Sequence, residues 1–322
     1  MARLRGEGEE EVRLPRRGAG PVSRHFLTDI VWFNAAGFLA LHAAGLIGVV
    51  AGLLWAKLLT DLWAFLLLFL TGQAVVIGAH RLYAHRAFKA AWVLRLAIVL
   101  LHTMAGQNSL YEWVRDHRQH HRYSDTHADP HNIHRGFFFS HVGWLMMRKH
   151  PLVVEKGRAI DMSDIEEDLL VMLQKKYYKF LYVICAFLVP VGVPVVLFGE
   201  NIFTSIWVCF FARYVALLNI TWSVNSLAHI YGCRPYHKGM MARDHPLVAC
   251  LTWGEGWHNF HHCFPYDYRP GELGWVLDVS GRLVELLERW GLASDLRTAS
   301  PAAVLRRAVI CGDGSHPAAP TP

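Results

Sequence analysis

The stretch His258-Asn259-Phe260-His261-His262 decides how this chain can fold, because it has a counterpart at His117-Arg118-Gln119-His120-His121. Residues three and four positions apart lie on one face of a helix, so each segment is expected to present three imidazoles to one point. Two such segments, in a chain whose 20 histidines are strongly clustered, predict a metal centre.

Two further pairs extend this pattern. His80 and His85 directly follow an apolar run, and Asn225 precedes His229 by four residues at the end of another. Nine histidines exceed what one ion can coordinate, and the chain has no Cys-x-x-Cys pair of the kind used in structural zinc sites. Two ions with imidazole-rich shells are therefore expected. Imidazole binds zinc, copper, nickel and iron alike, so the ligands do not identify the element.

Histidines that stand alone are a weaker signal, since a solitary imidazole is more often a hydrogen-bonded core or surface residue than a ligand. We expect no metal at these positions, which are His25, His42, His102, His237, His245 and His316.

The composition is that of a membrane protein. Of the 322 residues, 53% are hydrophobic, the mean hydropathy is +0.22, and long stretches contain no Asp, Glu, Lys or Arg. The six cysteines show no framework spacing, which predicts free thiols facing a reducing compartment. The net charge of +6 is modest, and we expect membrane lipid and no nucleic acid as a partner.

Four apolar runs are each close to the roughly 20 residues that cross a hydrocarbon core. Pro190 and Pro194 interrupt the third run, where a kink is tolerated. Arg213 lies in the fourth and is expected to face protein, because a charge facing lipid is costly. The apolar run 96–111 is too short to cross and is expected to form a helix that lies in the interface or beneath the soluble part. The expected spans cover residues 31–54, 62–79, 180–199 and 202–222.

This number of spans places both ends of the chain on one side of the membrane, together with residues 80–179 and 223–311. Lys and Arg concentrate on that side, so the positive-inside rule makes it cytosolic. Residues 1–29 are expected to be a disordered basic tail and not a signal peptide, since they lack an apolar segment. Residues 30–311 then form one domain and 312–322 a C-terminal tail. The predicted fold is an all-α integral membrane protein with four transmembrane helices and a cytosolic helical cap that carries a histidine-rich di-metal site.

The chain resembles the membrane fatty acyl-CoA desaturases, most closely the stearoyl-CoA (Δ9) desaturases of animals. The resemblance runs from Val31 to the ending Gly312-Asp313-Gly314-Ser315-His316. Besides the histidine segments it rests on Gly78-Ala79-His80-Arg81-Leu82, Tyr111-Glu112-Trp113, Arg115-Asp116-His117-Arg118, Thr126-His127-Ala128-Asp129-Pro130-His131-Asn132, Gly136-Phe137-Phe138-Phe139-Ser140-His141-Val142-Gly143-Trp144, Arg148-Lys149-His150-Pro151, Arg234-Pro235-Tyr236 and Gly254-Glu255-Gly256.

The resemblance implies an endoplasmic reticulum enzyme that removes two hydrogens from adjacent methylenes of stearoyl- or palmitoyl-CoA. It would use O2 and electrons from cytochrome b5 and its reductase, and would form a cis Δ9 double bond. Unactivated C–H bonds offer no acidity to a general base, so a metal must carry this chemistry. The implied cofactor is a pair of iron ions, with Asn225 reaching one of them through a water and with nine ligands: His80, His85, His117, His120, His121, His229, His258, His261 and His262.

The resemblance also implies a narrow, bent acyl tunnel. Its bend would be set by Gln107, Trp113 and Thr221, and its closed end is expected near residues 66–74. The CoA end would be held by Asn34, Asn108, Arg115, Asp116, Arg148, Lys149 and Trp222. Taken alone, the pair Arg148-Lys149 would instead be a membrane-proximal basic pair that favours anionic lipid.

Carboxylates close in sequence to the ligands are candidates for hydrogen bonds to their second ring nitrogen, although each could equally be a solvated acid or a turn former. These are Asp125, Asp129, Glu255 and Asp267.

Two segments depart from the family pattern. Tyr83-Ala84 stands where animal members usually have Trp-Ser, and Leu251-Thr252-Trp253 is bulkier than usual. Neither change removes a ligand, so both bear on substrate preference and not on the reaction class.

Three other functions compete with this reading. A membrane di-iron hydroxylase would insert oxygen in place of the double bond. A histidine-rich metal transporter would place its ligands within the spans near the bilayer midplane, whereas these segments are polar and lie outside the apolar runs. A catalytically inactive lipid or metal sensor would not need the complete ligand set.

Overall fold

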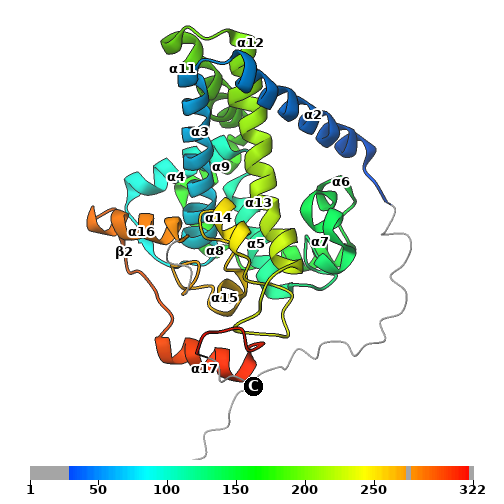
Figure 1. The fold of residues 1–322 in the computed structure, drawn as a ribbon, viewed down its shortest axis with the longest axis vertical. Helices are drawn as coiled ribbons and strands as arrows, with labels where there is room; N and C mark the ends of the chain where they lie inside the picture. Colours follow the sequence, from blue (N-terminus) through cyan, green and yellow to red (C-terminus); the bar gives the residue numbers. More distant parts are fainter. Residues whose placement is uncertain (1–28, 273–276, 319–322) are drawn as a thin grey trace, which may run out of the picture.

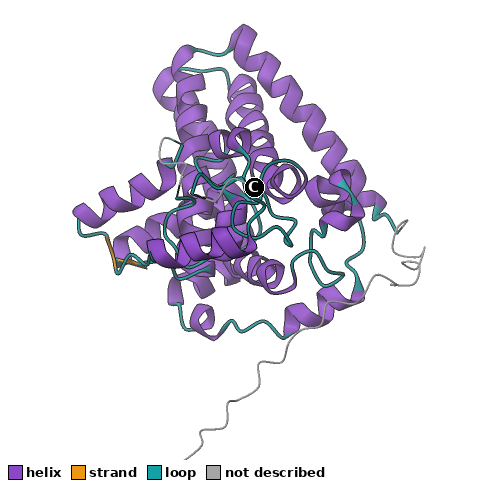
Figure 2. Ribbon diagram, turned by 60° about the horizontal axis from the view of Figure 1, so that its bottom comes forward, coloured by secondary structure: helices purple, strands orange, loops and turns teal. Residues whose placement is uncertain are grey.

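The computed structural model describes residues 29–272 and 277–318, and the predicted basic tail 1–29 lies almost wholly outside them. The fold is all-α, as predicted. The described strands are two residues long, β1 (Lys89–Ala90) and β2 (Ala293–Ser294), and pair antiparallel with Lys89 opposite Ser294 (Figure 2).

Four continuous helices among the described residues are long and apolar enough to cross a membrane. Two of them, α3 with η1 and α12 with η5 and α13, run down the centre of the molecule in Figure 1, while α2 slants away from them with much of its surface exposed. Each helix after the first includes a π-helical segment. Their parts are α2 (Trp32–Trp55); α3 (Leu58–Gln73) with η1 (Ala74–Ala84); α10 (Tyr178–Tyr182), η4 (Val183–Leu188) and α11 (Val189–Phe198); and α12 (Ile202–Ser205), η5 (Ile206–Ala212) and α13 (Arg213–Ile230).

The second and fourth of these helices are longer than the predicted spans 62–79 and 202–222. Both helices continue past their apolar residues because the cap packs against their ends and provides hydrogen-bond partners for the polar side chains there. His80, Asn225 and His229 therefore lie on the helices themselves, not in segments that follow them.

The remaining described elements form the cap at the lower end of the bundle in Figure 1. They are α4 (Trp92–Ala105), α5 (Leu110–Tyr123), η2 (Ile133–Arg135), η3 (Phe139–Gly143), α6 (Trp144–Met146), α7 (Pro151–Arg158), α8 (Ser163–Glu166), α9 (Leu169–Lys176), α14 (Pro246–Leu251), α15 (His258–Cys263), α16 (Val279–Arg289) and α17 (Pro301–Cys311).

The apolar run 96–111 is not one helix as predicted. It is divided at Gly106, which ends α4 in a left-handed conformation with φ of 70° that glycine adopts without strain. A new helix, α5, then begins with a capping box in which the side chain of Ser109 accepts from the backbone N–H of Glu112. This break gives α5 its own direction, and α5 carries three of the predicted ligands.

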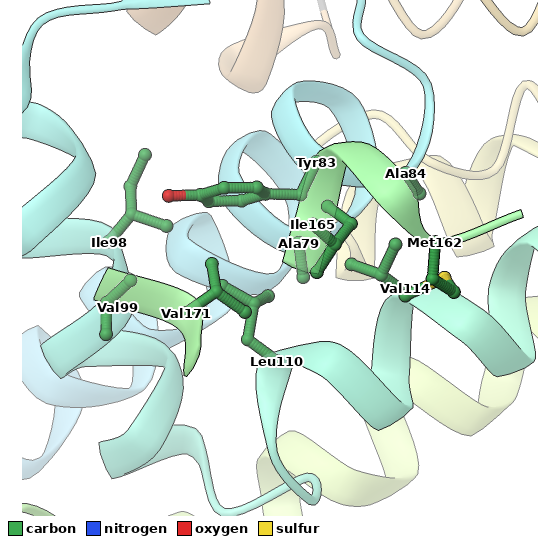
Figure 3. Packing of buried hydrophobic residues seen from close by; sticks show 10 residues of the cluster. All are labelled: Ala79, Tyr83, Ala84, Ile98, Val99, Leu110, Val114, Met162, Ile165 and Val171. Atoms are coloured by element: carbon green, nitrogen blue, oxygen red, sulfur yellow. The ribbon is translucent and has the colours of Figure 1, made fainter. Parts of the chain in front are cut away.

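A buried apolar cluster fixes α5 against the end of the second spanning helix (Figure 3). Ala79 and Tyr83 of η1 meet Leu110 and Val114 of α5, both of which are fully buried. The cluster is completed by Ala84, Ile98, Val99, Met162, Ile165 and Val171, which come from η1, α4, α9 and the segment around α8. Because His80 and His117 lie on these same two helices, the cluster also fixes the distance between them.

Arg213 is buried inside the bundle, as its cost in lipid predicted. Its Nε donates to the carbonyl of Cys209 at 2.9 Å, and its Nη2 lies 3.4 Å from the carbonyl of Met104. All six cysteines are free, as expected.

Candidate metal centre

Four helices that are far apart in the sequence meet where the bundle joins the cap. η1 carries His80 and ends just before His85, α5 carries the first His-x-x-His-His segment, α13 carries His229, and α15 carries the second segment. All nine predicted histidines lie at this junction.

The nine histidines form two separate groups, in each of which the candidate ligand atoms lie within 4.8 Å of one another. The first group contains His80, His85, His117, His121 and His261, and the second contains His120, His229, His258 and His262.

The prediction that each His-x-x-His-His segment points to a single position is wrong. His117 and His121 face the first group while His120 faces the second, and in α15 the assignment is reversed, with His261 facing the first group. At about 100° per residue, positions i and i+4 lie roughly 40° apart around a helix, whereas i+3 and i+4 lie roughly 100° apart. Each helix therefore supplies two ligands to one group and one to the other.

The spacing of the ring nitrogens fits bound ions. The Nε2 atom of His261 lies 2.9 Å from that of His80 and 3.0 Å from that of His121, so one proton on His261 cannot satisfy both contacts. In the second group the corresponding distances run from 3.0 to 3.3 Å, among His120, His229, His258 and His262. Ligands about 2.0–2.1 Å from an ion, at angles of about 90–110°, would be roughly 2.8–3.4 Å apart.

Carboxylates hold the second nitrogen of two ligands. Nδ1 of His80 lies 2.9 Å from Oε2 of Glu255, and Nδ1 of His120 lies 3.0 Å from both carboxylate oxygens of Asp129. An ionised carboxylate only accepts hydrogen bonds, so Nδ1 must carry the proton and Nε2 keeps its lone pair for a metal. Two of the expected carboxylate contacts are thus present.

The other two carboxylates behave differently. Oδ1 of Asp125 is 3.4 Å from Nδ1 of His229, a longer contact that a metal-loaded His229 could tighten. Asp267, by contrast, contacts no ligand ring. Its carboxylate accepts hydrogen bonds from the side chain of Arg269 and from the backbone N–H of Ala299. It therefore links two segments of the chain and does not orient an imidazole.

Neighbouring groups keep Glu255 ionised, whereas burial keeps the imidazoles neutral. Although burial itself would raise the pKa of Glu255, the positive charge of Arg81 and the hydrogen bond from His80 outweigh it and lower that pKa to about 2. Burial first, and neighbouring imidazoles second, hold the pKa of several histidines well below the ordinary value, so that they are neutral at pH 7. These are His85, His117, His121, His258, His261 and His262.

Two adjoining cavities reach the metal centre where the spanning helices meet the cap. The first, here called the outer cavity, is lined by Gln107, Asn108 and Asp116 together with apolar and aromatic residues. The second, the inner cavity, is lined by histidines on one side and by apolar residues such as Val75 and Leu217 on the other. They share four lining residues, Trp113, His117, Thr221 and Asn225.

The predicted bend residues meet at this shared boundary. Nε1 of Trp113 donates to Oε1 of Gln107 at 3.2 Å, and Nε2 of Gln107 donates to Oγ1 of Thr221 at 2.8 Å. Trp113 also stacks on the ring of His117 at a centroid distance of 5.0 Å. The cavity wall and the first histidine group are therefore linked directly.

The residues predicted to hold the CoA end spread over adjacent surfaces. Asn108, Asp116 and Trp222 line the outer cavity. Lys149 and Arg115 lie beside it, and Nζ of Lys149 is 3.2 Å from a carboxylate oxygen of Asp116. Arg148 lines a neighbouring basic hollow. Asn34 lines none of these cavities. It donates to the carbonyl of Leu145 and so fixes a residue of the outer cavity.

Sequence reasoning assigned no role to two residues that hold the centre together. Arg81 is fully buried and donates through Nε and Nη2 to Oε1 of Glu255. Asn259, between two ligands, is fully buried, and its side chain bonds the backbone of residues 236, 237 and 242. The sequence contains only weak signals for these roles. Arg81 follows a histidine at the end of an apolar run, and Asn259 lies inside the histidine segment.

His131 was also missed as a member of the site. Its Nδ1 lies 3.4 Å from Asp129, which also serves His120, and its ring lines the outer cavity. Among the described residues, the histidines that stand alone in the sequence lie outside the two groups, and His25 is not among the described residues.

The amino-acid sequence of this chain is similar to those of known fatty acid desaturases. Residues 60–270 match the model of the fatty acid desaturase family. An acyl-CoA Delta-9 desaturase of Acheta domesticus is 47% identical over 89% of this chain and 80% of that protein. An acyl-CoA Delta12-desaturase of the same species is 45% identical over 96% and 87%, and a stearoyl-CoA desaturase of Homo sapiens is 45% identical over 89% and 80%.

Proposed function

Because the chain belongs to the fatty acid desaturase family, we propose that it is the acyl-CoA Δ9 desaturase that its sequence suggests. It would convert saturated stearoyl- or palmitoyl-CoA into the cis monounsaturated product, using O2 and electrons delivered by cytochrome b5 and its reductase. The observation that carries this proposal is the pair of adjoining cavities, one with polar side chains in its lining and the other largely apolar away from the histidines, which meet beside the nine grouped histidines.

The histidine groups are proposed to hold two iron ions. The first ion would take the five-histidine group, and the second the four-histidine group with Asn225 reaching it through a water. When bound, the irons supply the oxygen-activating redox chemistry that no protein side chain can provide for an unactivated C–H bond. Every other task falls to the residues of this chain.

The chain's first task is to hold the ligands in place. Glu255 and Asp129 keep the proton on Nδ1 of His80 and His120, so that Nε2 of each ring faces its ion. Arg81 neutralises Glu255 inside the protein, which removes the cost of an isolated buried carboxylate. The ligands thereby keep their orientation before and after the reaction.

The second task is to position one C–C bond of a flexible chain. The linked side chains of Gln107, Thr221 and Trp113 form a rigid wall at the boundary between the two cavities. A chain that passes this wall must bend beside His117, and the apolar inner cavity excludes water from the bend. Positioning of this kind is proposed to set the location of the double bond.

The third task is to anchor the CoA moiety. Arg115, Arg148 and Lys149 bring positive charge to the mouth of the outer cavity, which suits the phosphates of CoA. Asp116 is already paired with Arg115 and Lys149, and this network would fix their orientation. Anchoring one end of the substrate determines which carbon reaches the bend.

The protein is a multi-pass membrane protein, and we propose that the cap and both termini face the cytosol at the endoplasmic reticulum. The excess of Lys and Arg on the cap side supports this orientation. The electron donor would then approach the cap, which holds most of the histidines, from the cytosol.

Expression in cells that lack their own Δ9 desaturase tests the proposal, with mass spectrometry of the fatty acids as the readout. We expect cis Δ9 products that are absent when His120 is changed to alanine. A Δ12 product would instead support a reaction like that named for the acyl-CoA Delta12-desaturase of Acheta domesticus. A product heavier by one oxygen would support a hydroxylase. Metal uptake into sealed vesicles without any change in fatty acids would favour a transporter.

A further inference from the structure

The inner cavity ends at a wall that the proposed chemistry does not use. On the metal side it is lined by His80, His117 and His258, and farther away by Gly72 and Trp253. Gly72 precedes His80 by eight residues on one continuous helix, which is roughly 12 Å along its axis. A substrate whose CoA lies in the outer cavity must place its methyl end in this part of the inner cavity.

Trp253 occupies the space beside Gly72. A Cβ atom built on Gly72 would lie 2.2 Å from Cζ3 and 2.4 Å from Cη2 of the indole, so the ring lies directly against the glycine backbone. Trp253 also packs with Val75, Ala105 and Leu217 at the same place. The bulky segment noted before the last histidine segment thus forms the part of the cavity wall that faces Gly72, a residue inside the range 66–74.

The indole is held rigidly. Trp253 has φ of 58°, a conformation that a bulky residue adopts only when its surroundings impose it. Its carbonyl accepts from the backbone N–H of Ser280 at 3.1 Å and from Oγ of Ser280 at 2.8 Å. Phe69 packs edge-on against the ring at a centroid distance of 5.8 Å. Because both the backbone and the side chain of Trp253 are held in place, we expect the indole to block a longer acyl chain and not to move aside for it.

We infer that Trp253 is the residue that sets the longest acyl chain this protein accepts. The inference rests on the proposed function, since it assumes that an acyl-CoA fills the two cavities, and it specifies the substrate class of that site. One methylene too many for a closed apolar pocket lowers affinity about 10- to 200-fold. A chain two carbons beyond the limit should therefore bind at least ~10-fold more weakly.

Binding of saturated acyl-CoAs of increasing length to the purified, metal-loaded protein tests this directly, for example by calorimetry with chains of even carbon number. Trp253→Gly is the informative variant, because glycine adopts a positive φ without strain while the cavity gains the volume of the indole. We expect the affinity maximum to move by two carbons or more. Trp253→Phe, which keeps an aromatic ring in the wall, should shift it in the same direction by less.

Two controls make the result specific. Adding Gly72→Leu to Trp253→Gly refills the space from the opposite wall and should restore the shorter limit. Trp63→Ala removes a tryptophan from the same helix α3, where it packs near Pro190 away from the cavity, and should leave the maximum unchanged.

An affinity maximum at the same length in the wild type and in both Trp253 variants would overturn the inference, as would a wild type without any length limit. The proposed function fails separately. A length limit that moves with Trp253, in a protein that forms no double bond in any acyl-CoA, supports the role of Trp253 and refutes desaturation.

Discussion

The Nε2 atoms of His80 and His261 lie 2.9 Å apart, although 181 positions separate these residues in the chain. One belongs to a membrane-spanning helix and the other to a short helix of the cap. Their proximity shows that the histidine groups are built from both parts of the molecule, the bundle and the cap.

Removal of one ligand should abolish activity without unfolding the bundle. His120→Ala takes away an imidazole from the four-histidine group, and we expect desaturation to fall below detection and the metal content to fall by about one ion per chain. Fatty-acid analysis and elemental analysis of the purified protein measure both effects. His134→Ala, which changes an exposed histidine of η2 outside both groups, is the control. Normal product formation by His120→Ala would contradict the ligand assignment.

Loss of the Glu255 charge should loosen the first group. Glu255→Gln keeps the shape but can no longer hold both Nδ1 of His80 and the guanidinium of Arg81 as an anion. Changes to such partners typically cost 10- to 100-fold in metal affinity or activity, and we expect about that loss here. Glu288→Gln, on the exposed side of α16, provides the matched control. An unchanged metal affinity in Glu255→Gln would show that His80 does not depend on this contact.

Acid should release the metals and destabilise the cap. Six histidines have folded-state pKa values well below their ordinary 6.5, so the unfolded chain binds more protons than the folded one below that pH. Their contribution to stability is complete above pH ~6.5 and falls as the pH drops further. Glu255 adds almost nothing to this change between about pH 7.5 and 5.5, because there it is ionised in the folded chain, with a pKa of about 2, and nearly fully ionised in the unfolded chain. Metal content and melting temperature at about pH 7.5, 6.5 and 5.5 measure the effect.

One buried acid opposes this trend. Burial raises the pKa of Asp244 to about 7, so the folded state holds a proton there that the unfolded chain has lost, and this group favours folding as the pH falls. Asp244 accepts from the backbone N–H groups of Asn259 and Phe260, an acceptor role that Asp244→Asn retains. The acid-induced loss should therefore be steeper in Asp244→Asn. A shallower loss would show that the sign assigned to Asp244 is wrong.

Disruption of the cavity wall should alter where the double bond forms. Thr221→Val removes the oxygen that accepts from Gln107, at a cost of about 0.5–1.5 kcal/mol for one neutral hydrogen bond, and frees the amide that also holds Trp113. We expect a slower reaction with a mixture of positional isomers, measured by mass spectrometry of derivatised products. Thr204→Val, at the far end of the same spanning helix, should keep a single isomer. A single Δ9 product from Thr221→Val would show that this wall does not position the acyl chain.

The number of spanning helices and the membership of the site could both be predicted, because each depends on a local pattern. Uncharged runs of sufficient length form helices in a bilayer whatever surrounds them. Nine of the site's histidines were recognised by their spacing. His131 was not, because its contribution comes only from its position beside Asp129 and the outer cavity.

The sequence by itself determined that this is a membrane protein with a histidine-rich metal centre, since composition and i, i+3, i+4 spacing are properties of neighbouring residues. Only the tertiary structure decided how the ligands divide between the two groups. α5 and α15 face each other, and each supplies two histidines to one group and one histidine to the other. The same holds for the pairing of Arg81 with Glu255 and for the contact of Trp253 with Gly72. Such contacts join segments 140 or more positions apart, and their distances depend on how whole helices pack, which no local pattern contains.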